Sequence, residues 1–173
     1  MRARAFWRSV TDDRTDFLGR LIALFEDHGI RYCVVGGQGV NAYVEPVVSL
    51  DLDLAVALGQ LVETEALLRR TFTVERFPDS LNVAEPGSDL RVQLQTDPRY
   101  FPFVERAVPR EILGIVLPVA SIEDVLRGKV WAASDPARRA SKRQKDLADI
   151  ARLLEAHPEL RPLVPADVLA RLV

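Results

Sequence analysis

Hydrophobic residues recur along the chain at two spacings, one typical of helices and one typical of strands. Apolar residues three and four apart predict helices over residues 13–28, 38–43, 60–70, 122–133 and 141–156. Strict alternation predicts strands over 49–56 and 89–95, and shorter apolar runs predict strands over 31–35, 71–77, 81–84 and 115–119. Because these elements do not repeat as βαβ units, we expect an α+β fold with a small mixed sheet flanked by helices.

Prolines change this pattern in two places. Pro98, Pro102 and Pro109 predict a largely irregular segment after the strand over 89–95. Pro118 cannot donate a backbone hydrogen bond, so it places the strand over 115–119 at a sheet edge. Ser121 then begins the next helix in a capping-box-like arrangement.

Length and composition fit one folded domain over residues 1–173, of which 48% are hydrophobic. We expect a sheet-bearing core over about 13–119, with helices over about 120–173 packed on it. With 23 Lys+Arg against 25 Asp+Glu, the chain has no overall basic field that recruits nucleic acid. No apolar run approaches the ~20 residues that span a membrane, and the N-terminus lacks the apolar stretch of a secretory signal. We therefore expect a cytoplasmic protein with no membrane partner.

Few residues are available for metal or redox chemistry based on cysteine and histidine. Cys33 is the single cysteine, which excludes an internal disulfide and a cysteine-based zinc site. It lies on a core strand and is expected to be a small buried hydrophobe. His28 and His157 are the two histidines, and both are expected to be structural.

The strand over residues 49–56 carries two carboxylates among apolar side chains. Period-two geometry places Asp51 and Asp53 on one face, about 7 Å apart between Cα atoms. Like charges on a core strand repel each other and lose hydration, so a partner should offset that cost. Mg²⁺ suits this role because it prefers carboxylate and phosphate oxygens. The alternative is an exposed edge strand whose acids face water.

Two glycines precede this strand. Gly36 and Gly37 follow a buried strand, where glycine lets a backbone approach a ligand closely and lets a helix begin towards an anion. A plain turn would also explain them. The segment from Gly37 to Ala42 further fits the G-x-G-x-x-A dinucleotide fingerprint. Asp51 follows Gly37 by only 14 residues, however, where about 20 are expected.

The ordered set of motifs resembles the nucleotidyltransferase superfamily, especially small bacterial members similar to the AbiEii abortive-infection type IV toxins. Its first part is the glycine turn, a short helix and the strand with Ser49-x-Asp51-x-Asp53. The resemblance continues through Val119-Ala-Ser-Ile-Glu-Asp-Val-Leu-Arg-Gly-Lys129 and Lys145-Asp146-Leu-Ala-Asp149. It covers most of residues 17–155.

The resemblance implies magnesium-dependent transfer of a nucleotide from a nucleoside triphosphate to a hydroxyl of an RNA, a protein or a small molecule. It also implies a cognate toxin or antitoxin as partner. The residues so implied are Asp51 and Asp53 as catalytic metal ligands, with Gly36, Gly37, Ser49, Lys129 and Lys145 around the nucleotide.

The chain departs from the family pattern at two positions. Gln93 stands where a third catalytic acid is expected, and an amide supplies no negative charge and takes no proton at neutral pH. Val47 stands where family members often carry a basic residue. Asp89 and Asp97 lie nearby, but Asp89 is about 13 Å from Gln93 along the strand and Asp97 is in a turn, so neither is the expected substitute. A nucleotidyltransferase fold that binds or regulates without transferring is therefore the alternative function.

Cations gather in the C-terminal helices. The basic run consists of Arg138, Arg139, Lys142, Arg143 and Lys145. It is either a solvated helix start or a contact for triphosphate or an RNA backbone. Lys129 interrupts an apolar helix, and its pairing with Asp146 across two helices remains as good an interpretation as a substrate contact.

Overall fold

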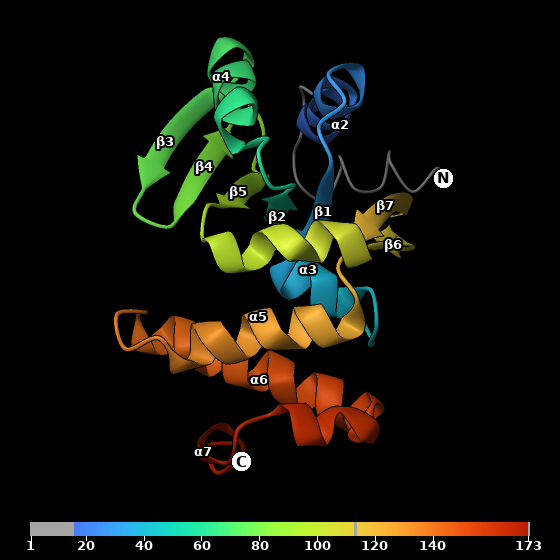
Figure 1. Cartoon of the computed structure of the whole chain (residues 1–173), viewed down its shortest axis with the longest axis vertical. Coiled ribbons are helices and arrows are strands. Elements are labelled where there is room, and N and C mark those ends of the chain that lie inside the picture. Colours follow the sequence, from blue (N-terminus) through green and yellow to red (C-terminus); the bar gives the residue numbers. More distant parts are fainter. Residues whose placement is uncertain (1–15, 113, 173) are drawn as a thin grey trace.

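The computed structural model describes residues 16–112 and 114–172, so residues 13–15 of the first predicted helix lie outside it. The predicted helices and strands occur in the predicted order, with boundaries that differ by a few residues (Figure 1). In chain order the elements are α2 (Phe17–Asp27), β1 (Tyr32–Val35), α3 (Gly36–Asn41), β2 (Asp51–Val56), α4 (Leu61–Thr71), β3 (Thr73–Phe77), β4 (Ser80–Ala84), β5 (Arg91–Gln95), η1 (Pro98–Arg106), β6 (Val108–Ile112), β7 (Ile115–Val119), α5 (Ile122–Ser134), α6 (Ala140–Ala156), η2 (Pro158–Leu163) and α7 (Ala166–Leu169). Of these, η1, β6, η2 and α7 are additional to the predicted elements.

The strands of the described ranges form one seven-stranded sheet in the order β3-β4-β5-β2-β1-β7-β6. The pairs β2–β5 and β1–β7 are parallel and the other neighbours are antiparallel. This mixed sheet with flanking helices confirms the predicted α+β class. Because β1 and β2 run antiparallel, they cannot form the parallel βαβ unit that a dinucleotide fingerprint requires.

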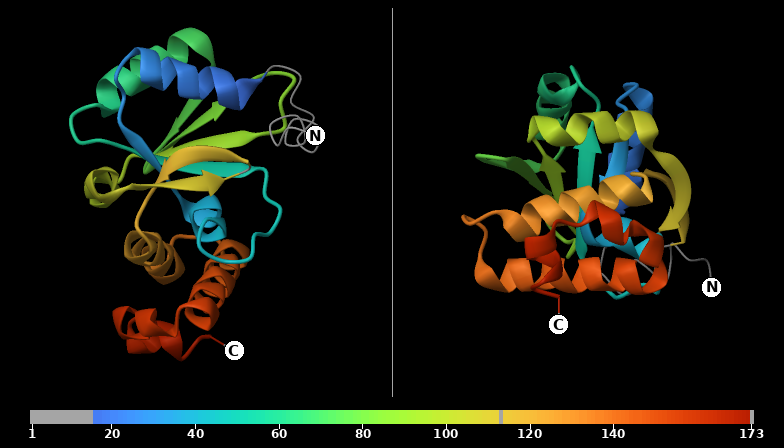
Figure 2. Two further views of the ribbon diagram at one scale, coloured as in Figure 1. Left: turned by 90° about the vertical axis from the view of Figure 1, so that its right-hand side faces the viewer. Right: turned by 60° about the horizontal axis from the view of Figure 1, so that its bottom comes forward.

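The sheet separates two layers of helices (Figure 2). Helices α2 and α4 cover one face, and α3, α5 and α6 lie on the other. In β2, Leu52, Leu54 and Val56 belong to the hydrophobic cluster on the α2 side, whereas Ala55 belongs to the cluster on the α5 side. The alternation seen in the sequence thus gives β2 one wholly apolar face and one face on which acids replace apolar side chains.

Two predictions about the proline-rich region were wrong. The segment over 98–109 is not irregular, because Pro98–Arg106 forms the 3₁₀ helix η1 and Val108–Ile112 forms strand β6. Strand β6 escapes a pattern search because it is exposed along most of its length and has no apolar alternation. It occupies the sheet edge that the sequence assigned to β7. Pro118 is tolerated inside the sheet because it faces Pro109 on β6 and β7 pairs with β1 only at Val119.

The C-terminal helices are built on the α3 side of the sheet. Helix α5 begins as predicted, with the Ser121 hydroxyl accepting a hydrogen bond from the Asp124 backbone N–H at 3.2 Å. Helix α6 packs beneath α5, and its buried residues Leu147, Ile150 and Leu153 lie in the same hydrophobic cluster as α5. In the described ranges, no helix is long and apolar enough to cross a membrane.

Candidate active site

Strand β2 lies in the middle of the sheet and places its two acids beside two other strands. Asp53 is level with Val35 on β1 and with Gln93 on β5, and Asp51 is level with Arg91 on β5. The position predicted for a third acid is therefore next to Asp53, and an amide occupies it.

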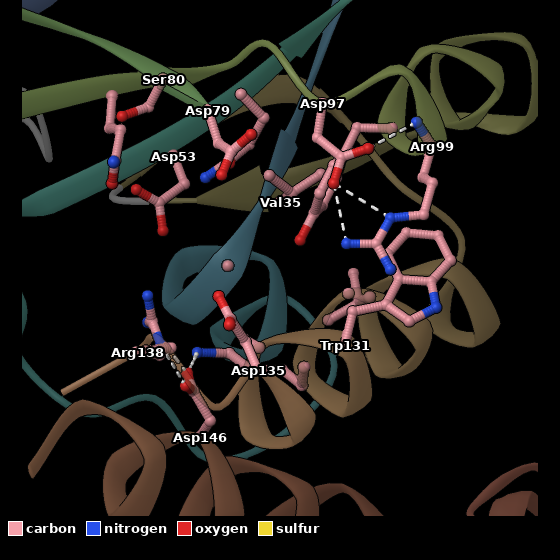
Figure 3. A pocket seen from close by; sticks show the side chains of 18 of the residues that line it. Val35, Asp53, Asp79, Ser80, Asp97, Arg99, Trp131, Asp135, Arg138 and Asp146 are labelled. Atoms are coloured by element: carbon pink, nitrogen blue, oxygen red, sulfur yellow. Dashed lines mark hydrogen bonds and ion pairs between the residues drawn. The ribbon is translucent and has the colours of Figure 1, made fainter. Parts of the chain in front are cut away.

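Asp53 lies half-buried on the floor of a pocket beneath the sheet (Figure 3). Burial raises the pKa of its carboxyl to about 6, an effect that Lys129 opposes and Asp51 reinforces. Within the described ranges, no arginine or lysine forms an ion pair with Asp53. Among the described residues, this half-buried carboxylate therefore has no direct ion-pair partner.

The backbone of Gly36 lies directly against the Asp53 carboxylate. Its φ is +66°, and a Cβ at this position would lie 2.1 Å from Oδ2 of Asp53. Gly37 has open space where its Cβ would be. The first glycine is therefore required by the acid, whereas the second leaves the start of α3 open to a ligand.

Asp51 has a different environment from Asp53. Its Oδ1 is 2.7 Å from Nε of Arg91, whose side chain is 71% exposed. The Asp51 backbone N–H donates to the Ser49 hydroxyl at 3.2 Å, so that hydroxyl is engaged within the turn before β2. The sequence analysis missed Arg91. In the parallel pair of β2 and β5, the register that places Gln93 beside Asp53 also places Arg91 beside Asp51.

The pocket is a cavity of about 240 Å³ between the sheet, η1 and α5. It is lined by Val35, Gly36, Asp53, Asp79, Ser80, Gln93, Gln95, Asp97, Arg99, Tyr100, Asp124, Val125, Gly128, Lys129, Trp131, Ala132, Asp135, Arg138 and Asp146. The structure thus brings together four of the predicted residues, Gly36, Asp53, Gln93 and Lys129. It does not bring Gly37, Ser49, Asp51 or Lys145 into the same lining.

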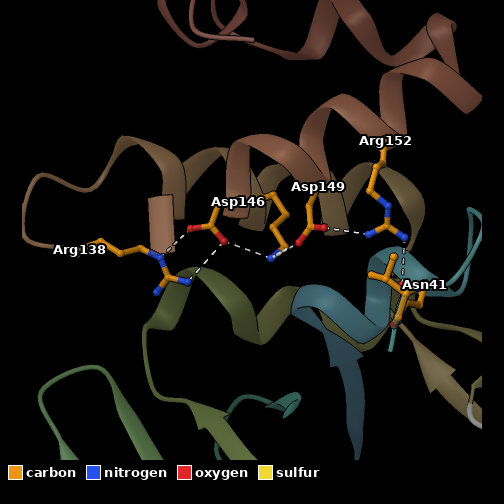
Figure 4. A network of polar contacts seen from close by, with 7 residues as sticks. Asn41, Arg138, Asp146, Asp149 and Arg152 are labelled. Atoms are coloured by element: carbon orange, nitrogen blue, oxygen red, sulfur yellow. Dashed lines mark hydrogen bonds and ion pairs between the residues drawn. The ribbon is translucent and has the colours of Figure 1, made fainter. Parts of the chain in front are cut away.

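Lys129 is buried and pairs with two acids of α6, Asp146 and Asp149, which Figure 4 shows side by side on that helix. Its Nζ is 3.1 Å from Asp146 Oδ1 and 2.8 Å from Asp149 Oδ2. Burial alone would lower the pKa of Lys129, but Asp149 and Asp146 outweigh it and raise that pKa, with a contribution from Asp53. Lys129 thus forms the predicted pair with Asp146 and also lines the pocket, and its contact with a substrate stays a prediction.

Each of these two acids of α6 also forms an ion pair with an arginine. Arg138 Nε is 2.6 Å from Asp146 Oδ2, and Arg152 Nη1 is 2.9 Å from Asp149 Oδ1. Arg138 also lines the pocket, whereas Lys145 is exposed on another face of α6. Of the basic run, Arg138 is therefore the residue that contributes its side chain to this lining.

Arg152 also reaches the loop before β2. Its Nη2 donates to Asn41 Oδ1 at 3.1 Å, and the Asn41 amide forms two hydrogen bonds with the Val47 backbone, at 2.8 and 3.1 Å. Gln38 donates from Nε2 to the Ser49 carbonyl at 3.1 Å. Two amides of α3 and one guanidinium of α6 therefore hold the loop that leads into Ser49 and β2.

Sequence analysis also missed a cluster of three aromatic side chains at the pocket. Tyr100, Phe103 and Trp131 contact one another with ring centroids 5.3–5.5 Å apart, and Arg99 lies over the Trp131 ring. Asp97, weighed as a substitute third acid, lines the pocket but is ion-paired with Arg99 at 2.7 Å. Asp89 does not line it.

The two strand acids fit a metal that is shared with a substrate. In the part of the chain that the structure describes, no three acids, histidines or cysteines gather into a metal-binding cluster. Mg²⁺ is usually held by one or two carboxylates together with water and substrate phosphates. Asp53 without a counter-ion and Asp51 beside it match that donor set. Asp51 can take part through Oδ2 while its Oδ1 pairs with Arg91, and that pair offsets part of its charge.

Comparisons with known proteins identify the family and the fold. Residues 24–173 match the family model described as nucleotidyl transferase AbiEii toxin, type IV toxin–antitoxin system. A search of curated proteins finds no match. Among solved structures, the chain is similar to ANT(2'')-Ia in complex with adenylyl-2''-tobramycin, with 15% identity, 90% of this chain and 97% of that chain covered, and a TM-score of 0.59.

Two further structures share the fold. One is the lincomycin-bound lincosamide antibiotic adenylyltransferase LnuA, with 12% identity, coverage of 82% of this chain and 99% of that chain, and a TM-score of 0.53. The other is an antigenic nucleotidyltransferase-like protein from Paracoccidioides brasiliensis, with 18% identity, coverage of 88% and 84%, and a TM-score of 0.52. At these identities the likeness shows a common fold.

Proposed function

Because the chain belongs to the AbiEii family of nucleotidyl transferase toxins, we propose that it transfers a nucleotide from a nucleoside triphosphate to a hydroxyl acceptor, with magnesium held at Asp51 and Asp53. The observation that carries this proposal is Asp53, a half-buried carboxylate that lines the pocket against Gly36 and has no ion pair with any of the described residues. A protein that keeps such a group close to a glycine backbone leaves room for a cationic or metal-bound ligand.

In the proposed reaction, the acceptor oxygen attacks the α-phosphorus, a new P–O bond forms and the bond to pyrophosphate breaks. Magnesium, when bound, would neutralise and orient the phosphate oxygens. Gly36 leaves room for the Asp53 carboxylate at the pocket, and Lys129, which also lines it, supplies positive charge. Gln93 can orient the acceptor through its amide but cannot take the hydroxyl proton, so transfer should be slow.

The acceptor is proposed by chemical class. The two similar antibiotic-modifying structures support a small-molecule hydroxyl, and the toxin family supports an RNA or a protein hydroxyl. The family also supports a cognate antitoxin as partner and action in the cytoplasm.

Calorimetric titration tests this proposal. ATP, GTP, CTP and UTP would each be titrated with and without magnesium into the wild type, Asp53→Asn and the control Asp89→Asn, whose residue does not line the pocket. We expect one or more triphosphates to bind only with magnesium, and Asp53→Asn to weaken this binding at least about 100-fold. Binding unaffected by Asp53→Asn would contradict the proposal. A screen for labelled nucleotide transfer to RNA and protein should follow.

A second function is favoured by the residues beside the strand acids. Arg91 pairs with Asp51 and Gln93 stands beside Asp53, so neither neighbour supplies the third carboxylate that could take the acceptor's proton. The alternative is a binding or regulatory protein that keeps the fold. If Gln93→Asp creates transfer that the wild type lacks, this alternative holds. If the wild type transfers and Asp53→Asn abolishes it, the alternative is wrong.

A further inference from the structure

One side of the pocket presents a guanidinium held in a fixed plane. In Figure 3, Arg99 and Trp131 lie across the pocket from Asp53. The Arg99 guanidinium carbon is 4.5 Å from the centroid of the Trp131 ring. Asp97 Oδ2 accepts from Nε of Arg99 at 3.0 Å and from its Nη2 at 2.7 Å. Ring stacking and these two hydrogen bonds together fix both the position and the plane of the guanidinium.

The aromatic group beneath Arg99 is rigid. Trp131 stacks on Phe103 at 5.5 Å with an interplanar angle of 18°, and Tyr100 meets both rings edge-on. Gly128 makes room for Tyr100, because a Cβ there would lie 3.2 Å from the tyrosine ring. Phe103, Trp131 and Arg99 therefore follow one another in a stack, and the Arg99 side chain lines the pocket and is 55% exposed overall.

The charges around this stack disfavour a phosphate. Asp97 offsets the charge of Arg99, and Asp79 and Asp135 also line the pocket. Positive charge lies elsewhere, at Lys129 and Arg138 near the floor. A flat, uncharged ring fits the open face of a guanidinium, since bases stack on arginine planes as they do on aromatic rings.

We propose that the Arg99–Trp131 stack is the platform on which the base of the nucleoside triphosphate lies, with its triphosphate directed towards Gly36 and Asp53. This inference rests on the proposed function. Gln95 also lines the pocket, and its amide offers a donor and an acceptor to the edge of the base. Arg99 is thus a substrate-binding residue whose plane, more than its charge, selects a nucleoside triphosphate over a bare polyphosphate.

The test compares two ligands that differ by a nucleoside. Each nucleoside triphosphate and inorganic tripolyphosphate, all with magnesium, would be titrated into the wild type, Arg99→Lys and Arg99→Ala. The matched control is Arg31→Ala, which removes an exposed arginine paired with Glu105 outside the pocket. We expect both Arg99 variants to weaken nucleoside triphosphate binding at least about 10-fold and to leave tripolyphosphate binding unchanged.

Fluorescence gives an independent readout. In a Trp7→Phe background Trp131 is the single tryptophan, and we expect nucleoside triphosphate, but not tripolyphosphate, to change its emission. An Arg99→Lys variant with wild-type affinity would overturn the inference. Equal loss of both ligands would also overturn it, because Arg99 would then be a phosphate contact.

The outcomes separate this inference from the proposed function. If the wild type binds tripolyphosphate and nucleoside triphosphates equally in an Asp53-dependent manner, the phosphate site stands and the base platform is wrong. If no triphosphate binds the wild type with magnesium, the proposed function and the platform are both wrong.

Discussion

Two pairs of aspartates lie near the pocket, one on a strand and one on a helix, and the protein neutralises them very differently. Asp146 and Asp149 of α6 are buried and share Lys129, whose Nζ lies within 3.1 Å of both. Asp51 and Asp53 of β2 are partly open to solvent, and Asp53 has no ion pair within the described ranges.

The outer cations strengthen this difference. Arg138 and Arg152 add a second ion pair to each helix acid, whereas among the described residues the strand pair has one cation, the exposed Arg91, which binds Asp51. A buried acid costs several kcal/mol unless its charge is offset. The charges of Asp146 and Asp149 are therefore balanced within the fold, which indicates a structural role. The charge of the two strand acids is only partly balanced, so a ligand can offset the rest.

The largest expected effect comes from removing the shared lysine. Lys129→Met leaves Asp146 and Asp149 buried with half of their partners, and we expect a loss of about 3–5 kcal/mol in the free energy of unfolding. Thermal denaturation should show a fall in Tm of roughly 10 °C. If Lys129→Met kept wild-type stability but lost nucleotide binding, Lys129 would instead be a contact of the ligand.

The second effect concerns the glycine that touches the strand pair. Gly36→Ala introduces a Cβ 2.1 Å from Asp53 Oδ2 at a φ of +66°, so the carboxylate must move and the backbone is strained. We expect a loss of about 2 kcal/mol in stability and about 10-fold weaker binding of magnesium and triphosphate. Gly37→Ala is the control, because it meets open space and should change stability by less than about 0.5 kcal/mol.

The third effect depends on pH. Because burial raises the pKa of Asp53 to about 6, its ionisation costs stability as pH rises through the window from about 4 to 6. Asp53→Asn should stabilise the metal-free protein by about 1–2 kcal/mol at pH 7.5, after allowance for solvent at the pocket floor. Urea denaturation at about pH 4 should show a difference of only a few tenths of a kcal/mol. A variant less stable than the wild type at pH 7.5 would contradict the comparison.

The smallest effect is expected at the exposed pair. Arg91→Ala removes an arginine that is 71% exposed, so stability should change by less than about 0.5 kcal/mol. Because the change frees Asp51, calorimetry should show magnesium-dependent triphosphate binding strengthened by about 2- to 5-fold. Arg31→Ala, which breaks an exposed pair elsewhere, should leave binding unchanged. If Arg91→Ala bound the triphosphate more weakly than the wild type, Arg91 would instead be a contact of the ligand.

Local patterns predicted the sheet and its helices well, because alternation and helical spacing are properties of neighbouring residues. The apolar face of β2 was confirmed from Leu52, Leu54 and Val56. Strand β6 was missed because an exposed edge strand needs no apolar alternation. The division of the chain at about residue 119 into two parts stays a prediction.

The site was harder to predict than the fold. Lys145 directly precedes the buried Asp146, and adjacent residues of a helix face directions about 100° apart, so its exposure follows from helical geometry. The contact of Arg99 with Trp131 had no local signal, because it joins η1 to α5 across the fold. Such long-range contacts depend on packing that no short motif records.

The hold of Arg152 on Asn41 has a consequence for biosynthesis. The chain leaves the ribosome from its N-terminus, so both strand acids are made about 100 residues before Arg152. Until α6 emerges, the loop before β2 lacks its guanidinium contact and the Lys129 amine lacks both of its carboxylates. A growing chain therefore carries the acids without the completed support around them. For a member of a toxin family, this order means that the support around the two strand acids is completed only once α6 has been made.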